Sequence, residues 1–193
     1  MQTYITIVSG LPRSGTSMMM RMLDAGGMKL VTDNIRKPDQ DNPKGYYEFE
    51  KVRKIKEDSA WLNNVHGKVV KMVSMLLYYL PPDKNYKVIF MRRDMAETLA
   101  SQRIMLERKG IEDKQSDEAM ARFFEKHLFE IEKWLGGQAN MNIFYVNYSD
   151  ILDNPLKSAG LVNAFLGRNL NIDEMVNAVD KSLYRNKKGT IHV

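Results

Sequence analysis

A short glycine-bounded segment near the N-terminus constrains the fold of this chain more than any other feature. Residues 10–17 have the sequence GLPRSGTS. The largely apolar run over residues 4–8 before this loop predicts a strand, and the residues after it predict a helix. Backbone N–H groups in such a loop, together with the helix N-terminus, converge on one point where a phosphate fits. The segment therefore predicts an anion-binding loop between a buried strand and a helix.

The two glycines have the spacing of the phosphate-binding Walker A loop, but the lysine of that motif is absent. Thr16 stands at the lysine position, and Arg13 is the one cation within the loop. This composition favours a phosphate-like ligand and argues against hydrolysis of ATP with magnesium. The alternatives are a loop that binds some other phosphate compound and a turn without a ligand.

Strand and helix patterns alternate along the rest of the chain. The predicted strands are Thr3–Ser9, Lys68–Ser74, Lys87–Met91 and Asn142–Asn147. The predicted helices are Ser14–Ala25, Phe49–Leu62, Met95–Arg108, Ser116–Leu135, Pro155–Leu166 and Ile172–Val179. Strands separated by helices pair in parallel. We therefore expect an α/β fold, a P-loop-type three-layer sandwich with a mainly parallel central sheet flanked by helices. The long loop Thr32–Tyr47 is a candidate for a functional segment.

Length and composition exclude several classes of protein. The 193 residues predict a single domain spanning 1–193. The absence of cysteine excludes disulfides and thiolate metal sites and favours a cytoplasmic location. We find no leader pattern, and no apolar run approaches the ~20 residues of a membrane helix. The net charge of +5 favours anionic partners, but the cations form no long block, so we expect neither a membrane nor a nucleic acid as partner.

A second candidate anion site follows the third predicted strand. Arg93 stands at the carboxyl end of that strand, and Ser101 comes eight residues later, in the next helix. Ligands of open parallel sheets bind beyond the carboxyl ends of the strands, so Arg93 and the first loop are expected to face one crevice. An arginine beside a hydroxyl makes a good phosphate site. The alternative is that Arg93 is an ion-pair partner of Asp94 or Glu97.

These segments resemble the sulfotransferases that use 3′-phosphoadenosine 5′-phosphosulfate (PAPS). Residues 12–17 are similar to that family's 5′-phosphosulfate loop, in which proline and a cation precede Ser-Gly and two hydroxyl residues. Arg93 with Ser101 is similar to its 3′-phosphate motif, although Met95 stands where proline is usual. The segments that resemble bacterial members are Asn42–Glu48, Tyr148–Pro155 and Phe165–Gly167. The matches run in order from residue 9 to residue 167.

The resemblance implies binding sites for both ends of PAPS. The residues expected to bind the 5′-phosphosulfate are Pro12, Arg13, Ser14, Gly15, Thr16 and Ser17. Arg93 and Ser101 are expected to bind the 3′-phosphate, and Arg185 is a further candidate because its tail segment is similar to a family loop over that phosphate. The product would be adenosine 3′,5′-bisphosphate (PAP). No metal is expected, because no predicted strand ends in an acidic residue suited to hold magnesium.

The resemblance also implies the reaction. A sulfonate group passes in line from PAPS to a hydroxyl or amine of an acceptor, while the protein supplies position and charge. Arg13 is expected to act as a fixed cation at the leaving oxygen, because an arginine does not readily release a proton. The predicted general base is Glu48, with His66 as second choice. His127 and His192 are less suited, because one lies in a packed helix and the other in the tail.

We expect a small molecule, a carbohydrate or a lipid as acceptor. Tyr46, Tyr47 and Trp61 are candidates for its pocket, and core packing is an equal alternative for Trp61. Two other functions stay open: a P-loop nucleotide kinase or NTPase, and a non-catalytic nucleotide-binding protein of sulfotransferase ancestry. The methionine run over residues 18–22 is interpreted as adaptable core rather than as a metal or redox site.

Overall fold

The computed structural model describes residues 4–33, 35–111 and 115–184, and its centre is a five-stranded sheet. The strands are β1 (Tyr4–Gly10), β2 (Leu30–Val31), β3 (Val69–Lys71), β4 (Asn85–Arg92) and β5 (Met141–Asn147). They lie in the order β2-β3-β1-β4-β5, and every neighbouring pair is parallel. The predicted parallel α/β sheet is therefore confirmed. The short edge strand β2 was not predicted, because two residues carry no detectable alternation.

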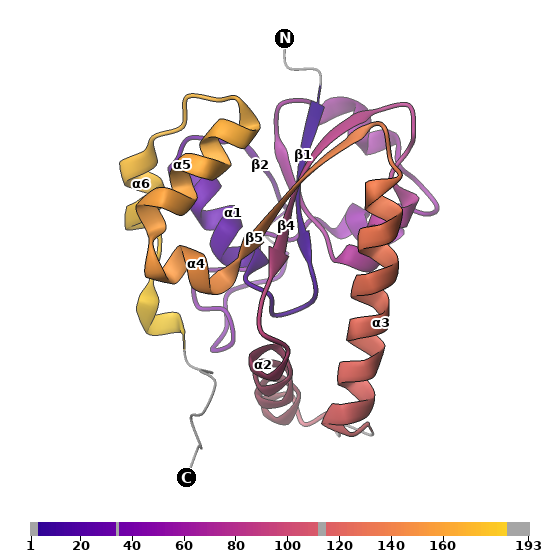
Figure 1. Cartoon of the computed structure of the whole chain (residues 1–193), viewed down its shortest axis with the longest axis vertical. Helices are drawn as coiled ribbons and strands as arrows, with labels where there is room; N and C mark the ends of the chain where they lie inside the picture. The colour runs from indigo at the N-terminus through magenta and orange to yellow at the C-terminus, as the bar shows by residue number, and fades with distance from the viewer. Residues whose placement is uncertain (1–3, 34, 112–114, 185–193) are drawn as a thin grey trace.

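Helices cover both faces of this sheet. They are α1 (Thr16–Ala25), α2 (Met95–Arg108), α3 (Asp117–Gly136), α4 (Tyr148–Asp153), α5 (Pro155–Leu166) and α6 (Ile172–Asn177). Short 3-10 helices add η1 (Glu50–Lys54), η2 (Ala60–Asn64), η3 (Ser74–Tyr79) and η4 (Lys181–Leu183). Figure 1 shows α1, α4, α5 and α6 on one side of the sheet and α3 on the other, with α2 beyond its lower edge.

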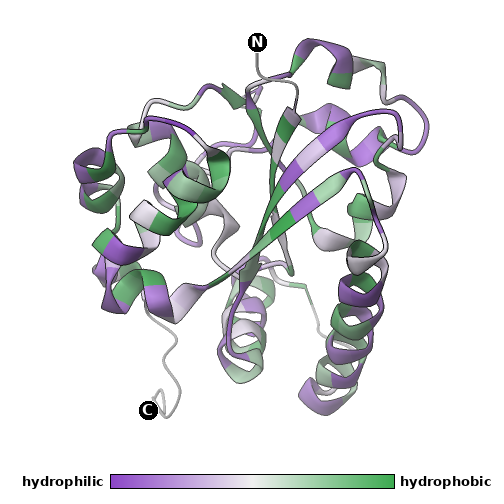
Figure 2. Cartoon of the chain, turned by 45° about the horizontal axis from the view of Figure 1, so that its top comes forward, coloured by the Kyte–Doolittle hydropathy of each residue, from purple (hydrophilic) through white to green (hydrophobic). Residues whose placement is uncertain are grey.

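The alternation of side chains along the strands gives two large cores, one on each face of the sheet. In β4, Val88 and Phe90 point into one core, and Ile89 and Met91 point into the other. The first core is closed by α3 with η1, η2 and η3, and the second by α1, α4, α5 and α6. Hydrophobic and hydrophilic residues alternate around α3, which presents one apolar side to the sheet (Figure 2). This is the predicted three-layer sandwich.

The methionine run of α1 packs as predicted. Met19, Met20 and Met22 are fully buried in the second core. They share this core with Val8 of β1 and Val69 of β3, and their unbranched side chains fill irregular space between helix and sheet.

Two predicted elements differ from the structure, and one helix was not predicted. The helix expected over Phe49–Leu62 is instead the pair η1 and η2, because the Asp58 carboxylate accepts from the Ala60 N–H and turns the chain between them. The strand expected over Lys68–Ser74 stops at Lys71, and η3 follows. Residues 148–153, for which no helix was predicted, form the helix α4.

Candidate active site

A pocket of about 510 Å³ opens at the carboxyl edge of the sheet. Its walls come from the first loop, the segment 36–48, the ends of β3 and β4, α2, and the residues around α4 and η4. β1 and β4 run side by side with Gly10 opposite Met91, so their carboxyl ends open onto the same space. The sheet topology therefore brings together segments that are far apart in the sequence.

The loop between β1 and α1 has a strained, left-handed backbone. Arg13 has φ 68° and Gly15 has φ 97°, a backbone region that residues other than glycine rarely adopt. A Cβ at Gly15 would lie 2.4 Å from the ring of Tyr148, so only glycine fits there. Thr16 and Ser17 open α1 and line the pocket, and their N–H groups precede the first intrahelical bond. The helix N-terminus thus points a positive end into the pocket.

Ser14 shapes this loop rather than lining the pocket. Its N–H and its hydroxyl both donate to the Leu11 carbonyl, at 3.2 and 2.7 Å, and its side chain is buried. Pro12, Arg13, Gly15, Thr16 and Ser17 do line the pocket. Of the six loop residues predicted to hold the ligand, Ser14 is the one whose polar groups are already used within the loop.

Arg13 and Ser101 are in direct contact. The Arg13 Nε donates to the Ser101 Oγ at 2.9 Å, and its Nη2 donates to the Asp41 carbonyl at 3.2 Å. Burial lowers the pKa of Arg13, while the nearby Asp41 opposes the shift. The hydroxyl on α2 therefore meets the arginine of the first loop, whereas the sequence motif pairs it with Arg93.

Arg93 lies against the same loop from the other side. Its Nη1 donates to the Arg13 carbonyl at 3.2 Å, and its Nε forms an ion pair with Glu97 at 3.1 Å. The ring of Tyr148 lies under the guanidinium, 4.6 Å from its Cζ. The predicted convergence of Arg93 with the first loop and the alternative ion pair with Glu97 are therefore both present.

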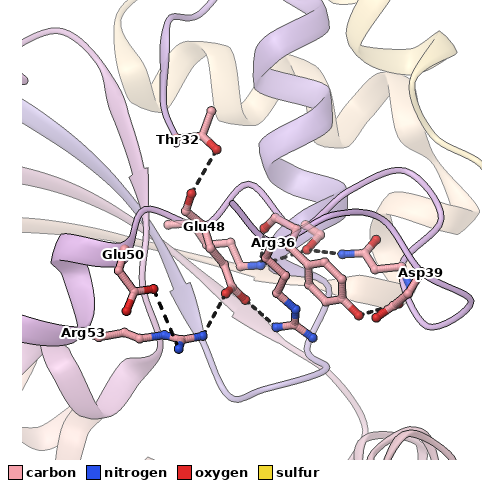
Figure 3. Close-up of polar contacts among 10 residues, drawn as sticks. Thr32, Arg36, Asp39, Glu48, Glu50 and Arg53 are labelled. Carbon is pink, nitrogen blue, oxygen red and sulfur yellow. Dashed lines mark hydrogen bonds and ion pairs between the residues drawn. The ribbon is translucent and has the colours of Figure 1, made fainter. Parts of the chain in front are cut away.

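Glu48 lies in the pocket wall with both carboxylate oxygens paired (Figure 3). Oε1 contacts Arg36 Nη1 at 2.7 Å, and Oε2 contacts Arg53 Nη2 at 3.2 Å. Arg36 also lies over the ring of Tyr46, whose hydroxyl donates to Asp39 at 2.6 Å. Burial and this hydrogen bond raise the pKa of Tyr46 to about 12. In the segment 36–48, a chain of contacts thus joins Glu48 to Arg36, Arg36 to the ring of Tyr46, and the Tyr46 hydroxyl to Asp39.

His66 is not brought to this pocket. It is exposed and precedes β3, and its neighbour Gly67 donates to the carbonyl of Tyr4, the first residue of β1. Parallel strands place this end of the sheet opposite the carboxyl edge, so His66 faces away from the other candidates. Arg185 and His192 lie outside the residues that the structure describes.

The other histidine and two of the three aromatic candidates belong to the cores. His127 is buried on α3 and shares a hydrogen bond of 2.8 Å with the Ser74 hydroxyl. Trp61 packs in the first core against Phe49, and Tyr47 packs against the second. Tyr46 alone of the three aromatics lines the pocket. The expectation for Tyr47 is therefore wrong, and for Trp61 the alternative of core packing is confirmed.

Lys71 is a site residue that the sequence analysis missed. It ends β3, and its Nζ donates to the Ser17 hydroxyl at 3.0 Å and to the Tyr46 carbonyl at 2.6 Å. Burial lowers the pKa of Lys71 to about 8. The sequence indicates this residue by its position, because Lys71 directly follows a buried apolar pair, Val69 and Val70, at the carboxyl end of a strand.

The segment 36–48 crosses the loop and fastens to it. The Asn42 side-chain amide donates to the Ser17 hydroxyl at 2.8 Å. The Asp41 carboxylate, nearly buried, pairs with Arg108 of α2 at 2.7 Å. The functional role expected for this long loop is therefore supported by its position at the rim of the pocket.

Comparison with known protein families identifies this arrangement. The family model described as the sulfotransferase domain matches residues 5–191. The chain belongs to the sulfotransferase domain family. The resemblance predicted from the loop, the Arg93–Ser101 spacing and the later segments is confirmed. No curated protein matches the sequence significantly.

Several solved structures share this fold at low sequence identity. Mouse sulfotransferase SULT7A1, complexed with PAP, matches with a TM-score of 0.62 and 14% identity over 98% of this chain and 69% of its own. Retinol dehydratase, in complex with androsterone and the inactive cofactor PAP, gives 0.52 and 17% over 92% and 64%. The sulfotransferase domain of the Synechococcus PCC 7002 olefin synthase gives 0.55 and 13% over 95% and 80%. The chain thus spans about two-thirds to four-fifths of the length of these proteins.

Within residues 4–33, 35–111 and 115–184, no group of three or more His, Asp or Glu side chains is placed to hold a metal ion. In the same ranges, no helix combines the length and apolar character needed to cross a membrane.

Proposed function

We propose that this chain transfers a sulfonate group from PAPS to a hydroxyl or amine of an acceptor. The observation that carries the proposal is the contact between Arg93 and the first loop, with its Nη1 3.2 Å from the Arg13 carbonyl. It supports a single pocket with cations at two points, as a nucleotide with phosphates at both ends of its ribose requires. The PAP complexes of the mouse enzyme and of retinol dehydratase support the same donor.

The 5′-phosphosulfate is proposed to lie against the first loop and the start of α1. Thr16 and Ser17 offer N–H groups there, and Arg13 and Lys71 offer positive charge in a largely buried setting. In-line transfer leaves charge on the oxygen of the departing 5′-phosphate, and fixed cations close to that oxygen lower the barrier. Arg13 contributes charge and hydrogen bonds and keeps its proton.

The 3′-phosphate is proposed to lie on the Arg93 side of the loop. Ser101 lines the same pocket and accepts from Arg13 Nε at 2.9 Å. A phosphate that enters between these groups takes hydrogen bonds from Arg93 and from the Ser101 hydroxyl, while Arg13 turns toward the leaving oxygen. Arg185 stays a sequence-based candidate for this phosphate.

Glu48 is proposed as the general base. Each carboxylate oxygen has two lone pairs, and the ion pairs with Arg36 and Arg53 occupy one on each oxygen. An acceptor hydroxyl beside Glu48 can therefore still donate its proton. His66 is not retained, because its position at the opposite edge of the sheet separates it from the loop. The small-molecule, carbohydrate and lipid classes all remain candidates for the acceptor.

Nucleotide binding provides the first test. Calorimetric titration is expected to show binding of PAP without magnesium, no competing preference for ATP with magnesium, and loss of PAP binding in Arg93→Ala. A preference for ATP with magnesium would contradict the proposal. Turnover of radiolabelled PAPS is then measured with a panel of alcohols, phenols, amines and glycans. An enzyme is expected to release PAP in the presence of a suitable acceptor, whereas a binding protein would show no acceptor-dependent turnover.

A further inference from the structure

A buried carboxylate lies directly behind Arg93. Glu97, in the first turn of α2, has a side chain that is 7% exposed, and the Arg93 side chain is 8% exposed. Glu97 Oε2 accepts from Arg93 Nε at 3.1 Å. Its other oxygen, Oε1, accepts from the hydroxyl of Tyr184. A carboxylate removed from water to this extent is stable only with such partners on both oxygens.

The backbone of α2 also fixes the position of the Glu97 carboxylate. Asp94 caps α2 and accepts the Glu97 N–H at 3.2 Å, so the first turn that carries Glu97 cannot rotate without breaking the cap. Tyr184 follows η4 near the end of the described chain and is 87 residues away from Glu97 in sequence. The C-terminal segment is thereby joined to the start of α2.

These contacts hold the Arg93 guanidinium on three sides. Glu97 occupies its Nε edge, the Arg13 carbonyl accepts from Nη1, and the Tyr148 ring lies under its face. Tyr184 adds a second ring, 5.7 Å from Cζ. Because a guanidinium is planar, fixing two donors and one face fixes the direction of the whole group. Arginine otherwise loses substantial rotamer entropy when it binds an anion.

We propose that Glu97 and Tyr184 are positioning residues that hold Arg93 ready for the 3′-phosphate and so set the preference for 3′-phosphorylated adenine nucleotides. The inference rests on the proposed function, because it needs Arg93 to meet that phosphate. Neither Glu97 nor Tyr184 has to touch the nucleotide. The contrary view is that the Glu97 charge offsets that of Arg93 and weakens anion binding. The two views predict opposite effects when that charge is removed.

The test compares the dissociation constants of PAP and of adenosine 5′-monophosphate (AMP), which lacks the 3′-phosphate. The wild-type chain is expected to prefer PAP. Glu97→Gln is expected to weaken PAP about tenfold, because the charged partner of the arginine is lost, and to leave AMP within about twofold. Tyr184→Phe removes one hydroxyl and is expected to weaken PAP about threefold in the same direction. A merely structural defect would weaken both nucleotides alike.

The chain offers a matched pair of controls one residue away. Arg92 pairs with Glu132 at 2.7 Å and lies over the ring of Tyr145 at 3.9 Å, outside the pocket lining. Glu132→Gln therefore removes the same kind of ion pair, and Tyr145→Phe removes a hydroxyl while it keeps the ring over its arginine. Both variants are expected to leave the PAP to AMP ratio unchanged.

The positioning role and the proposed function can fail separately in this test. An unchanged ratio in both Glu97→Gln and Tyr184→Phe, or tighter PAP binding by Glu97→Gln, would overturn the positioning role while Arg93→Ala still loses the PAP preference. If Glu97→Gln does not fold, Tyr184→Phe decides the question, because it removes a single atom from a partly exposed side chain. A wild-type chain that binds AMP as well as PAP would instead refute the proposed function itself.

Discussion

Replacing Gly15 by alanine is expected to destabilise the chain by about 2–5 kcal/mol. Gly15 has φ 97°, and a left-handed backbone costs a side-chain residue about 1–2 kcal/mol. The added Cβ would lie 2.4 Å from Tyr148 Cδ2 and 3.0 Å from Cε2. Tyr148 is buried and held beneath Arg93, so the ring cannot simply turn aside, and overpacking of this kind costs about 1–3 kcal/mol.

Gly27 provides the matched control for the backbone cost. Its φ is 93°, close to that of Gly15, and a Cβ there would meet nothing within 4 Å. Gly27→Ala is therefore expected to cost only the backbone term of about 1–2 kcal/mol. The difference between the two variants isolates the contact between the loop and the Tyr148 ring.

Urea unfolding followed by circular dichroism measures both free energies, and thermal unfolding should show a fall in Tm of roughly 4–20 °C for Gly15→Ala. Because the displaced ring lies under Arg93, the same variant is expected to bind PAP more weakly, whereas Gly27→Ala is not. If Gly15→Ala unfolds no more easily than Gly27→Ala, then Tyr148 does not pack on the loop as described, and the reasoning fails.

Three further predictions concern titration and catalysis. Burial lowers the pKa of Lys71 to about 8, so its ammonium is lost above that pH, and kcat/KM is expected to fall there. In Lys71→Arg, whose charge persists, the fall should move to higher pH, and an unchanged profile would exclude a role for this charge. Burial also lowers the pKa of His127, so the unfolded chain takes up its proton first. Stability should therefore decrease as the pH falls below about 6.5, less so in His127→Gln, as denaturant titrations across this range will reveal. Finally, Glu48→Gln is expected to lower kcat about 100-fold and His66→Gln to leave it unchanged, and equal losses would contradict the base proposal.

The sequence predicts those parts of the site that local patterns encode. The first loop lies between a buried strand and a helix, so its shape follows from a few consecutive residues, and the position of Arg93 follows from the rule for the carboxyl ends of parallel strands. Lys71 could be assigned only in part in this way. The lysine after a buried apolar pair marks the end of a strand, but its contact with Ser17 depends on β3 lying beside β1, which is a property of sheet order.

The errors have similar causes. The segment Phe49–Leu62 carries buried apolar residues at irregular intervals, and the Asp58 turn divides it into two 3-10 helices that no single helical period describes. His66 is a histidine in a loop, as many catalytic bases are, but this loop lies before its strand rather than after it. In a parallel sheet that difference places a residue at opposite ends of the molecule.

Arg13 connects the two cationic points of the proposed nucleotide site. With φ 68°, its peptide turns so that its carbonyl faces Arg93, while its side chain runs toward Ser101 on α2. A non-glycine residue held in this region costs roughly 1–2 kcal/mol, and such strain persists where the surroundings require it. Here a single residue contacts both halves of the proposed 3′-phosphate motif and is also part of the proposed 5′-phosphosulfate loop. A phosphate that moves the Arg13 side chain away from Ser101 must therefore alter the loop that holds the other end of the nucleotide, so binding at the two ends is expected to be coupled.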